Sequence, residues 1–326
     1  MRSLSAAGVS AAMLALSLAV VTASAAGNKK PKDDPNQIGS RDVGKCLNMF
    51  SIEKEIALGK QLAEEVKRQA KLKEDPLISE FVNRVGQNLA RNSDAKVPFT
   101  FQVIEDEAPN AFALPGGFVF VNTGLLKIAD EEDEFAAALA HEIAHVAARH
   151  LTCQATKQQL LTLLALPAGA VLGGWGGVLA RQGMNAGMPA AFMKFTRANE
   201  AEADYLGVQY MYAAGYDPNG AISIFEKLEL LQRQKPGALS RIFASHPMDS
   251  TRIDKTQEEI QRILPSKPEY VLTTSEYHDI RERLITLDDR PKSDQRPTLR
   301  RAGPSQPGDD QDGDQRPTIR RRDLVE

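Results

Sequence analysis

Apolar residues recur along this chain in two patterns, one with the period of an α-helix and one typical of buried β-strands. Helical spacing marks five segments: 52–66, 76–89, 199–215, 218–231 and 249–264. Residues 99–104 and 117–122 are instead rich in the β-branched and aromatic residues of strands. Together the two patterns predict an α+β fold that is mostly helical and contains one small sheet.

A sixth helix is expected over residues 130–148, where three polar side chains interrupt an otherwise apolar surface. The acidic residues 130–134 suit the positive end of a helix dipole. Further along, His141 and His145 lie one turn apart on one face, with Glu142 beside them. Two imidazoles and a glutamate at this spacing are typical of zinc hydrolases, in which the glutamate is the general base. The alternative is a chance match, which in a chain with 5 His has a probability of very roughly one per cent.

Two histidines do not complete such a site, because catalytic zinc usually takes three protein ligands and a water molecule. The helix expected over 199–215 carries Glu200 and Asp204 one turn apart on the same face. We expect Glu200 to be the third ligand and Asp204 to accept a hydrogen bond from a ligand imidazole. A solvated acidic face is the alternative, but the apolar residues of this helix argue against it.

The three remaining histidines and Arg252 lie outside this set of expected ligands. His246 and Arg252 are candidates to stabilise an oxyanion, although a histidine before a proline is usually structural or exposed. If its loop reaches the zinc, His246 could instead occupy the water position at rest and keep the site latent. His150 is five residues past His145 and is expected to face away from the metal, so it and His278 are interpreted as structural or surface residues.

A short strand before the motif helix is a candidate site for binding an extended peptide. It comprises Asn110, Ala111, Phe112 and Ala113, and the sequence Pro115-Gly116-Gly117 follows it closely. An open sheet edge at this place could take up a peptide as an additional strand through main-chain hydrogen bonds. The alternative is a plain hairpin turn. Beside the zinc motif, the edge is the favoured interpretation.

The composition is that of a soluble globular protein and narrows the choice of partners. The 326 residues are 42% hydrophobic and 25% charged, and the net charge of −3 argues against a nucleic-acid partner. Residues 1–26 resemble a secretory signal peptide, with an uncleaved anchor as the alternative. Export would allow the only two cysteines, Cys46 and Cys153, to form a disulfide, but two separate buried thiols are equally compatible with the sequence.

Four regions are expected. Residues 27–50 read as a solvated linker after the signal peptide, 51–288 as the catalytic domain, and 289–326 as a disordered tail rich in Pro, Arg and Asp, in which DQRPT(L/I)RR occurs twice. Within the domain, Leu160 to Ala180 contains no charge over 21 residues. Its glycines and proline favour an apolar segment near the active site, which could contact either a membrane or an unfolded client, over a membrane-spanning helix.

Four motifs in order, NAFALPGG, HEIAHVAARH, NEAEAD and SHPMDSTR, resemble metallopeptidase family forty-eight, the zinc endopeptidases of the HtpX and CAAX-prenyl-protease type. The resemblance spans roughly residues 52–264 and is nearest to the exported BepA- and LoiP-like branch. It implies a zincin-type (gluzincin) domain whose edge strand borders the cleft and which holds one zinc ion per chain. The implied ligands are His141, His145 and Glu200. The implied general base is Glu142, with Asp204 in support and with His246 and Arg252 near the scissile carbonyl.

The resemblance further implies an exported endopeptidase of the periplasm, either free or membrane-associated, that removes unfolded or misassembled envelope proteins. The competing interpretation is a zinc-stabilised periplasmic chaperone or assembly factor with latent proteolysis. An intact Glu142 favours the enzyme, because a binding protein has no use for a general base. The chain departs from the branch in two respects: it has no tetratricopeptide array, which puts client recruitment by such an array in doubt, and its tail has no recognised counterpart.

Overall fold

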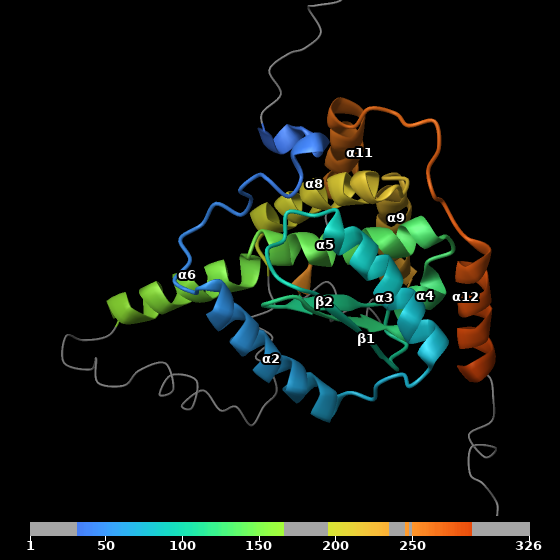
Figure 1. Ribbon diagram of the computed structural model, residues 1–326, viewed down its shortest axis with the longest axis horizontal. Coiled ribbons are helices and arrows are strands. Elements are labelled where there is room, and N and C mark those ends of the chain that lie inside the picture. The colour runs from blue at the N-terminus through green and yellow to red at the C-terminus, as the bar shows by residue number, and fades with distance from the viewer. Residues whose placement is uncertain (1–30, 166–194, 235–244, 248–249, 289–326) are drawn as a thin grey trace, which may run out of the picture. The chain divides into compact units, whose positions relative to one another are not determined.

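The architecture comes from a computed structural model that describes residues 31–165, 195–234, 245–247 and 250–288 (Figure 1). The chain divides into two units, Met1–Leu287 and Asp288–Glu326. Three predicted features lie outside the described residues: the signal peptide over 1–26, the tail over 289–326, and the apolar segment Leu160–Ala180 beyond residue 165. All candidate site residues named above belong to the first unit.

The described elements are mostly helices, as the sequence predicts. In chain order they are η1 (Pro31–Asp33), η2 (Pro35–Gln37), α2 (Ile52–Gln69), α3 (Pro76–Arg91), β1 (Thr100–Ile104), β2 (Ala111–Leu114), β3 (Phe118–Asn122), α4 (Thr123–Ile128), α5 (Glu132–Ala147), α6 (His150–Ala165), α8 (Arg197–Ala214), α9 (Gly220–Gln234), α11 (Ser250–Ile263) and α12 (Ser275–Asp288). One small sheet accompanies them, which confirms the α+β prediction. None of these described helices combines the length and the apolarity needed to cross a membrane.

The sheet has the strand order β1-β3-β2, with β1 parallel and β2 antiparallel to β3. The chain reverses between β2 and β3 at Gly116 (φ 76°) and Gly117 (φ 91°), left-handed values that glycine adopts without a steric penalty. The segment is therefore a hairpin. It is also an edge strand, because within the described part of the chain no strand pairs with the outer side of β2.

Helix α5 lies between the sheet and α8, and it also packs against α3 and α9 (Figure 1). Almost all of its side chains are buried, with Phe135, Leu139 and Ile143 fully enclosed. Helices α5 and α8 approach closely at Gly207, where an added Cβ would lie 3.4 Å from the backbone nitrogen of His141. This close packing brings the two helices that carry the sequence motifs face to face.

Residues 31–50, which the sequence predicts to be a solvated linker, are attached to the helices by several contacts, including one buried arginine and one disulfide. The buried Arg41 donates to Asp94 Oδ2 at 2.9 Å and to Gln209 Oε1 at 2.6 Å. Cys46 forms a disulfide with Cys153 of α6, with the two Cα atoms 5.9 Å apart. Of the two alternatives for the cysteines, the structure therefore has the disulfide, and it ties this segment to α6.

Candidate metal centre

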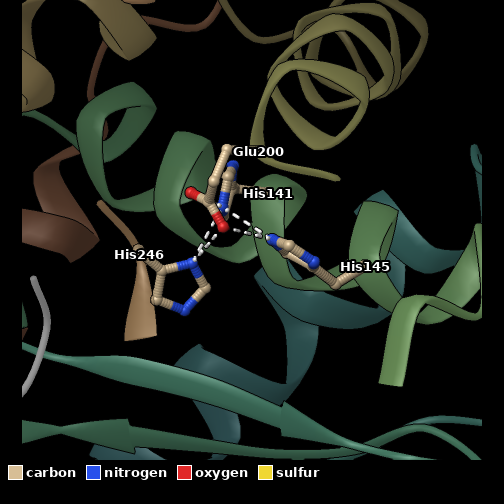
Figure 2. Close-up of side chains that lie close together, drawn as sticks. All are labelled: His141, His145, Glu200 and His246. Carbon is tan, nitrogen blue, oxygen red and sulfur yellow. Dashed lines mark hydrogen bonds and ion pairs between the residues drawn. The ribbon is translucent and has the colours of Figure 1, made fainter. Parts of the chain in front are cut away.

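Four buried side chains from three parts of the chain converge in the interior (Figure 2). His141 and His145 come from α5, Glu200 comes from α8, and the short segment 245–247 contributes His246. One ligand atom from each residue lies within 4.8 Å of those of the other three. The two α5 histidines meet because they are one turn apart, and Glu200 joins them because α8 packs closely against α5.

The spacing of these atoms fits a metal ion. His141 Nε2 is 3.0 Å from His145 Nε2 and 3.3 Å from His246 Nδ1. Glu200 Oε1 is 3.4 Å from His145 Nε2 and 3.1 Å from His246 Nδ1. A tetrahedral zinc ion with bonds of roughly 2.0–2.1 Å keeps its ligand atoms roughly 3.3 Å apart. Three imidazole nitrogens and one carboxylate at these distances suit such a cation, with His246 in the fourth position.

Asp204 and Arg252 lie behind His141. Asp204 Oδ1 is 2.9 Å from His141 Nδ1, the ring nitrogen opposite the one that faces the cluster. Arg252 donates from Nε and Nη2 to the two oxygens of Asp204, at 2.8 and 2.7 Å, and its Nη1 is 2.9 Å from Glu200 Oε2. Asp204 thus stands where a carboxylate would orient a ligand imidazole. Arg252 bridges two carboxylates, and its predicted oxyanion role stays a prediction.

The protonation of the cluster follows from burial and from these contacts. Burial alone would lower the pKa of His141, but Asp204 and Glu200 outweigh it and raise that pKa to about 10. Burial also holds the pKa of His145 well below its usual value. Burial would raise the pKa of Glu200, yet hydrogen bonds from the histidines outweigh it and lower that pKa. Without a metal, His141 therefore holds a second ring proton and is an imidazolium cation. A metal ion binds in competition with that proton.

Glu142 is buried beside the cluster and contacts the edge strand. Its Oε2 accepts a hydrogen bond from the Ala113 N–H at 2.9 Å, and its Oε1 is 3.5 Å from His246 Nε2. Burial raises the pKa of this carboxyl, which suits a group that must take up a proton. Alternate residues of an antiparallel strand turn their N–H groups away from the partner strand, so Ala113 can face Glu142. The predicted base and the predicted substrate edge are therefore adjacent.

Two small cavities border residues of β2. The first has a volume of about 60 Å³ and borders Ala111, His141 and Glu142, and its apolar wall includes Leu125, Ile224, Phe225 and Leu228. The second, of about 10 Å³, lies beside Ala113 and His145. The apolar lining of the first suits an apolar side chain next to the reacting bond.

His150 contacts the candidate ligand His145, so the expectation that it faces away from the metal is wrong. Its Nδ1 lies 2.9 Å from His145 Nδ1, and only 2% of the residue is exposed. That expectation assumed one continuous helix, whereas Arg149 adopts a left-handed conformation (φ 58°) between α5 and α6. The break turns His150 back toward His145. His278, in contrast, is exposed on α12, as expected.

Phe195 is another neighbour of the centre, and sequence reasoning missed it. The centroid of its ring lies 3.8 Å from that of His145 and 5.2 Å from that of His246. Its backbone N–H donates to the carbonyl oxygen of Ser245 at 3.1 Å. This hydrogen bond links the residues just before α8 to the segment that carries His246. The residue belongs to no motif and to no periodic stretch, so no local signal marks it.

Comparisons with known proteins show the family of the chain. The family model described as Peptidase family M48 matches residues 76–260. The β-barrel assembly-enhancing protease of Yersinia pestis is 31% identical over 234 residues, which cover 69% of this chain and 48% of that protein. The same-named protease of Escherichia coli K12 is 30% identical over 223 residues, covering 66% and 46%. The mitochondrial metalloendopeptidase OMA1 of Schizosaccharomyces pombe is 37% identical over 180 residues, covering 55% and 52%. The chain spans about half the length of these relatives.

Proposed function

The chain belongs to peptidase family M48, and from this premise we propose that it is a zinc-dependent endopeptidase that cleaves unfolded or misassembled proteins of the bacterial cell envelope. One observation carries the proposal: Glu142 lies between the Ala113 N–H of an edge strand and a buried cluster of metal-binding side chains. A general base, a peptide-binding edge and a cation site are thus adjacent. The names of the bacterial relatives, proteases that enhance β-barrel assembly, support action in the envelope.

The substrate in this proposal binds as an extended strand along β2. Main-chain hydrogen bonds to an edge strand do not depend on side chains, and they leave both ends of the peptide free. Only an unfolded segment can present an extended backbone in this way. Cleavage within disordered chains follows from this binding mode, and the apolar cavity beside Glu142 favours bonds next to an apolar residue.

The proposed chemistry divides between the metal site and Glu142. His141, His145 and Glu200 would hold a zinc ion, which would supply a Lewis acid for the scissile carbonyl and lower the pKa of a bound water to about 7. Glu142 takes a proton from the attacking water and delivers it to the leaving amine. Because burial raises the pKa of this carboxyl, it can hold the proton between the two transfers.

His246 has a regulatory role in the proposal. Its Nδ1 is 3.3 Å from His141 Nε2 and 3.1 Å from Glu200 Oε1, which places it in the fourth position of the cluster. In that position it takes the place of the attacking water and keeps the enzyme latent. The segment 245–247 would then have to move when a client arrives.

The proposed location is the periplasm, reached through the predicted signal peptide, with membrane-surface contact through Leu160–Ala180.

The test compares the purified protein with its Glu142→Gln variant for zinc content and for cleavage of casein, an unfolded protein. We expect both to hold one zinc ion per chain, and the variant to lose about 10²–10⁴-fold in activity because it lacks a base. A protein that binds no zinc would contradict the proposal. Equal zinc in both proteins with no cleavage by either would instead favour the chaperone alternative.

A His246→Ala variant then separates latency from catalysis. If His246 blocks the water position, its removal raises the rate of casein cleavage while Glu142 still provides the base. If His246 stabilises the oxyanion, its removal lowers kcat and leaves KM nearly unchanged. A fall in kcat would therefore overturn the latent arrangement but not the endopeptidase.

A further inference from the structure

His150 is a buried imidazole that the chemistry proposed above does not use. Its Nδ1 lies 2.9 Å from Nδ1 of His145, and its Nε2 lies 3.2 Å from Oε2 of Glu202 on α8. His150 itself is 2% exposed, whereas the side chain of Glu202 is 42% exposed. A line of contacts therefore runs from a partly hydrated carboxylate through His150 to a candidate metal ligand.

The fold brings His150 to this place by an unusual backbone conformation. In an unbroken helix, a residue five positions after His145 would be rotated by roughly 140° away from it. Arg149 interrupts the helix with φ at 58°, a value that non-glycine residues adopt only when their surroundings hold them there. Arg149 Nε donates to the buried Glu55 at 2.8 Å, and its Nη2 donates to Phe50 O at 2.6 Å. Contacts from the preceding segment and α2 thus maintain the turn that presents His150.

Binding of a metal by His145 Nε2 would define which ring nitrogens of the two histidines carry protons. For His145 Nε2 to offer a lone pair to a metal, the proton of this ring must be on Nδ1, and it then donates to His150 Nδ1. The proton of His150 must in turn be on Nε2, where it donates to Glu202. If only one of the two neutral rings took the opposite tautomer, the facing Nδ1 atoms of His145 and His150 would present two N–H groups or two lone pairs to each other. The chain of contacts is satisfied when His145 presents Nε2 to the centre.

We propose that His150 is a positioning residue that holds the metal ligand His145 in the orientation and tautomer required for binding zinc, with Glu202 as the outer acceptor. Ligand imidazoles almost always donate their second N–H to a carboxylate, a carbonyl or water. Asp204 stands in that position directly for His141, at 2.9 Å. His150 and Glu202 together provide the same support to His145. The inference rests on the proposed zinc site and adds a residue to it.

The test measures zinc affinity by competition with a chromophoric chelator, for the full chain and for four variants. His150→Leu removes the acceptor, and His150→Asn restores an acceptor oxygen near the place of Nδ1. Glu202→Ala removes the outer acceptor. His278→Leu is the matched control, because it makes the same substitution at an exposed position on α12.

We expect His150→Leu to bind zinc about 10–100-fold more weakly than the parent, and His150→Asn to recover most of that loss. Glu202→Ala has a smaller effect because water can replace a partly exposed acceptor. His278→Leu matches the parent. Nitrogen-15 spectra of the histidines in the zinc-free protein add a direct readout: His145 carries its proton on Nδ1 in the parent and loses this single tautomer in His150→Leu.

Three results would overturn the inference. The first is equal zinc affinity in His150→Leu and the parent. The second is an equal loss in His150→Asn and His150→Leu, which would show that the imidazole acts only through packing. The third is a parent that binds no zinc, which would overturn the proposed function together with this inference. Because the first two leave zinc binding by the parent intact, they separate failure of the inference from failure of the proposed function.

Discussion

The two ends of helix α5 both bury polar side chains, but they hold them in different ways. At the N-terminal end, Glu132 accepts hydrogen bonds from the hydroxyl of Tyr216, at 2.9 Å, and from the hydroxyl of Thr274. At the C-terminal end, the Nε2 atoms of His141 and His145 approach each other to 3.0 Å. Donors meet an acceptor at the first end, whereas like ring nitrogens converge at the second end, where a cation is the natural partner.

The difference separates the part of α5 that stabilises the fold from the part that binds a ligand. Hydrogen bonds at the first end contribute to stability whether or not a metal is present. At the second end, a cation that binds the folded state as proposed would add to stability. Substitutions at the first end should therefore change stability alone, and substitutions at the second end should change stability in a way that depends on zinc.

Arg252→Leu should have the largest effect, and it tests the second end. Its guanidinium lies 2.7 Å from Asp204 Oδ1 and 2.9 Å from Glu200 Oε2. Removing it takes one of the cations away from two buried carboxylates, which costs about 3–5 kcal/mol. We expect urea to unfold the metal-free variant at a much lower concentration, and zinc to restore part of the loss. Parental stability with a lowered kcat would instead assign Arg252 to the oxyanion of the substrate.

Glu132→Ala should have the next largest effect, and it tests the first end. The variant loses two hydrogen bonds to a buried charged acceptor, which contribute about 2–4 kcal/mol together. We expect the same loss in urea unfolding with and without zinc, and unchanged zinc affinity of the folded protein. Glu132→Gln keeps one acceptor oxygen and should lose less. A fall in zinc affinity would break the separation between the two ends.

Asp133→Asn should have the smallest effect on stability, and the size of that effect depends on pH. Burial raises the pKa of Asp133 to about 7, helped by the charges of Asp217, Glu134 and Glu131. A folded-state pKa above the unfolded value means that this group stabilises the protein most below about pH 4, and that this contribution is lost as the pH rises through 7.

The Asn variant has no charge to bury at any pH. Its Tm should therefore match that of the parent near pH 4 and exceed it above pH 7, by on the order of 1 kcal/mol or roughly 2–4 °C. Thermal unfolding across this range gives the result. A difference in Tm that does not vary with pH would show that Asp133 does not titrate as proposed.

Local spacing explains which parts of the candidate site the sequence could predict. His141 and His145 share a face of α5, and Glu200 and Asp204 share a face of α8, because residues four apart always do. The packing of α8 on α5 was not visible in the sequence. It joins two helices that are separated in the chain by α6, so no local spacing marks it.

The same distinction explains the strands and the missed residues. Alternation and strand propensity predicted β1 and β3, and the glycines after β2 predicted a reversal, but not the order β1-β3-β2 that leaves β2 at the edge. His150 was misplaced because helical periodicity was continued past Arg149. Phe195 was missed because its contact with His145 joins residues far apart in the chain.

The sequence by itself determined the mostly helical fold and the parts of the proposed chemistry that are local: the residue types of the candidate metal site, their helical spacing and the proposed base beside them. These follow from local periodicity, which any sufficiently long helix or strand imposes on neighbouring residues. The tertiary structure alone decided that His246 joins the cluster, that Ala113 holds Glu142 and that His150 contacts His145. Those contacts depend on packing and on one left-handed backbone turn, and both are set by residues distant in sequence.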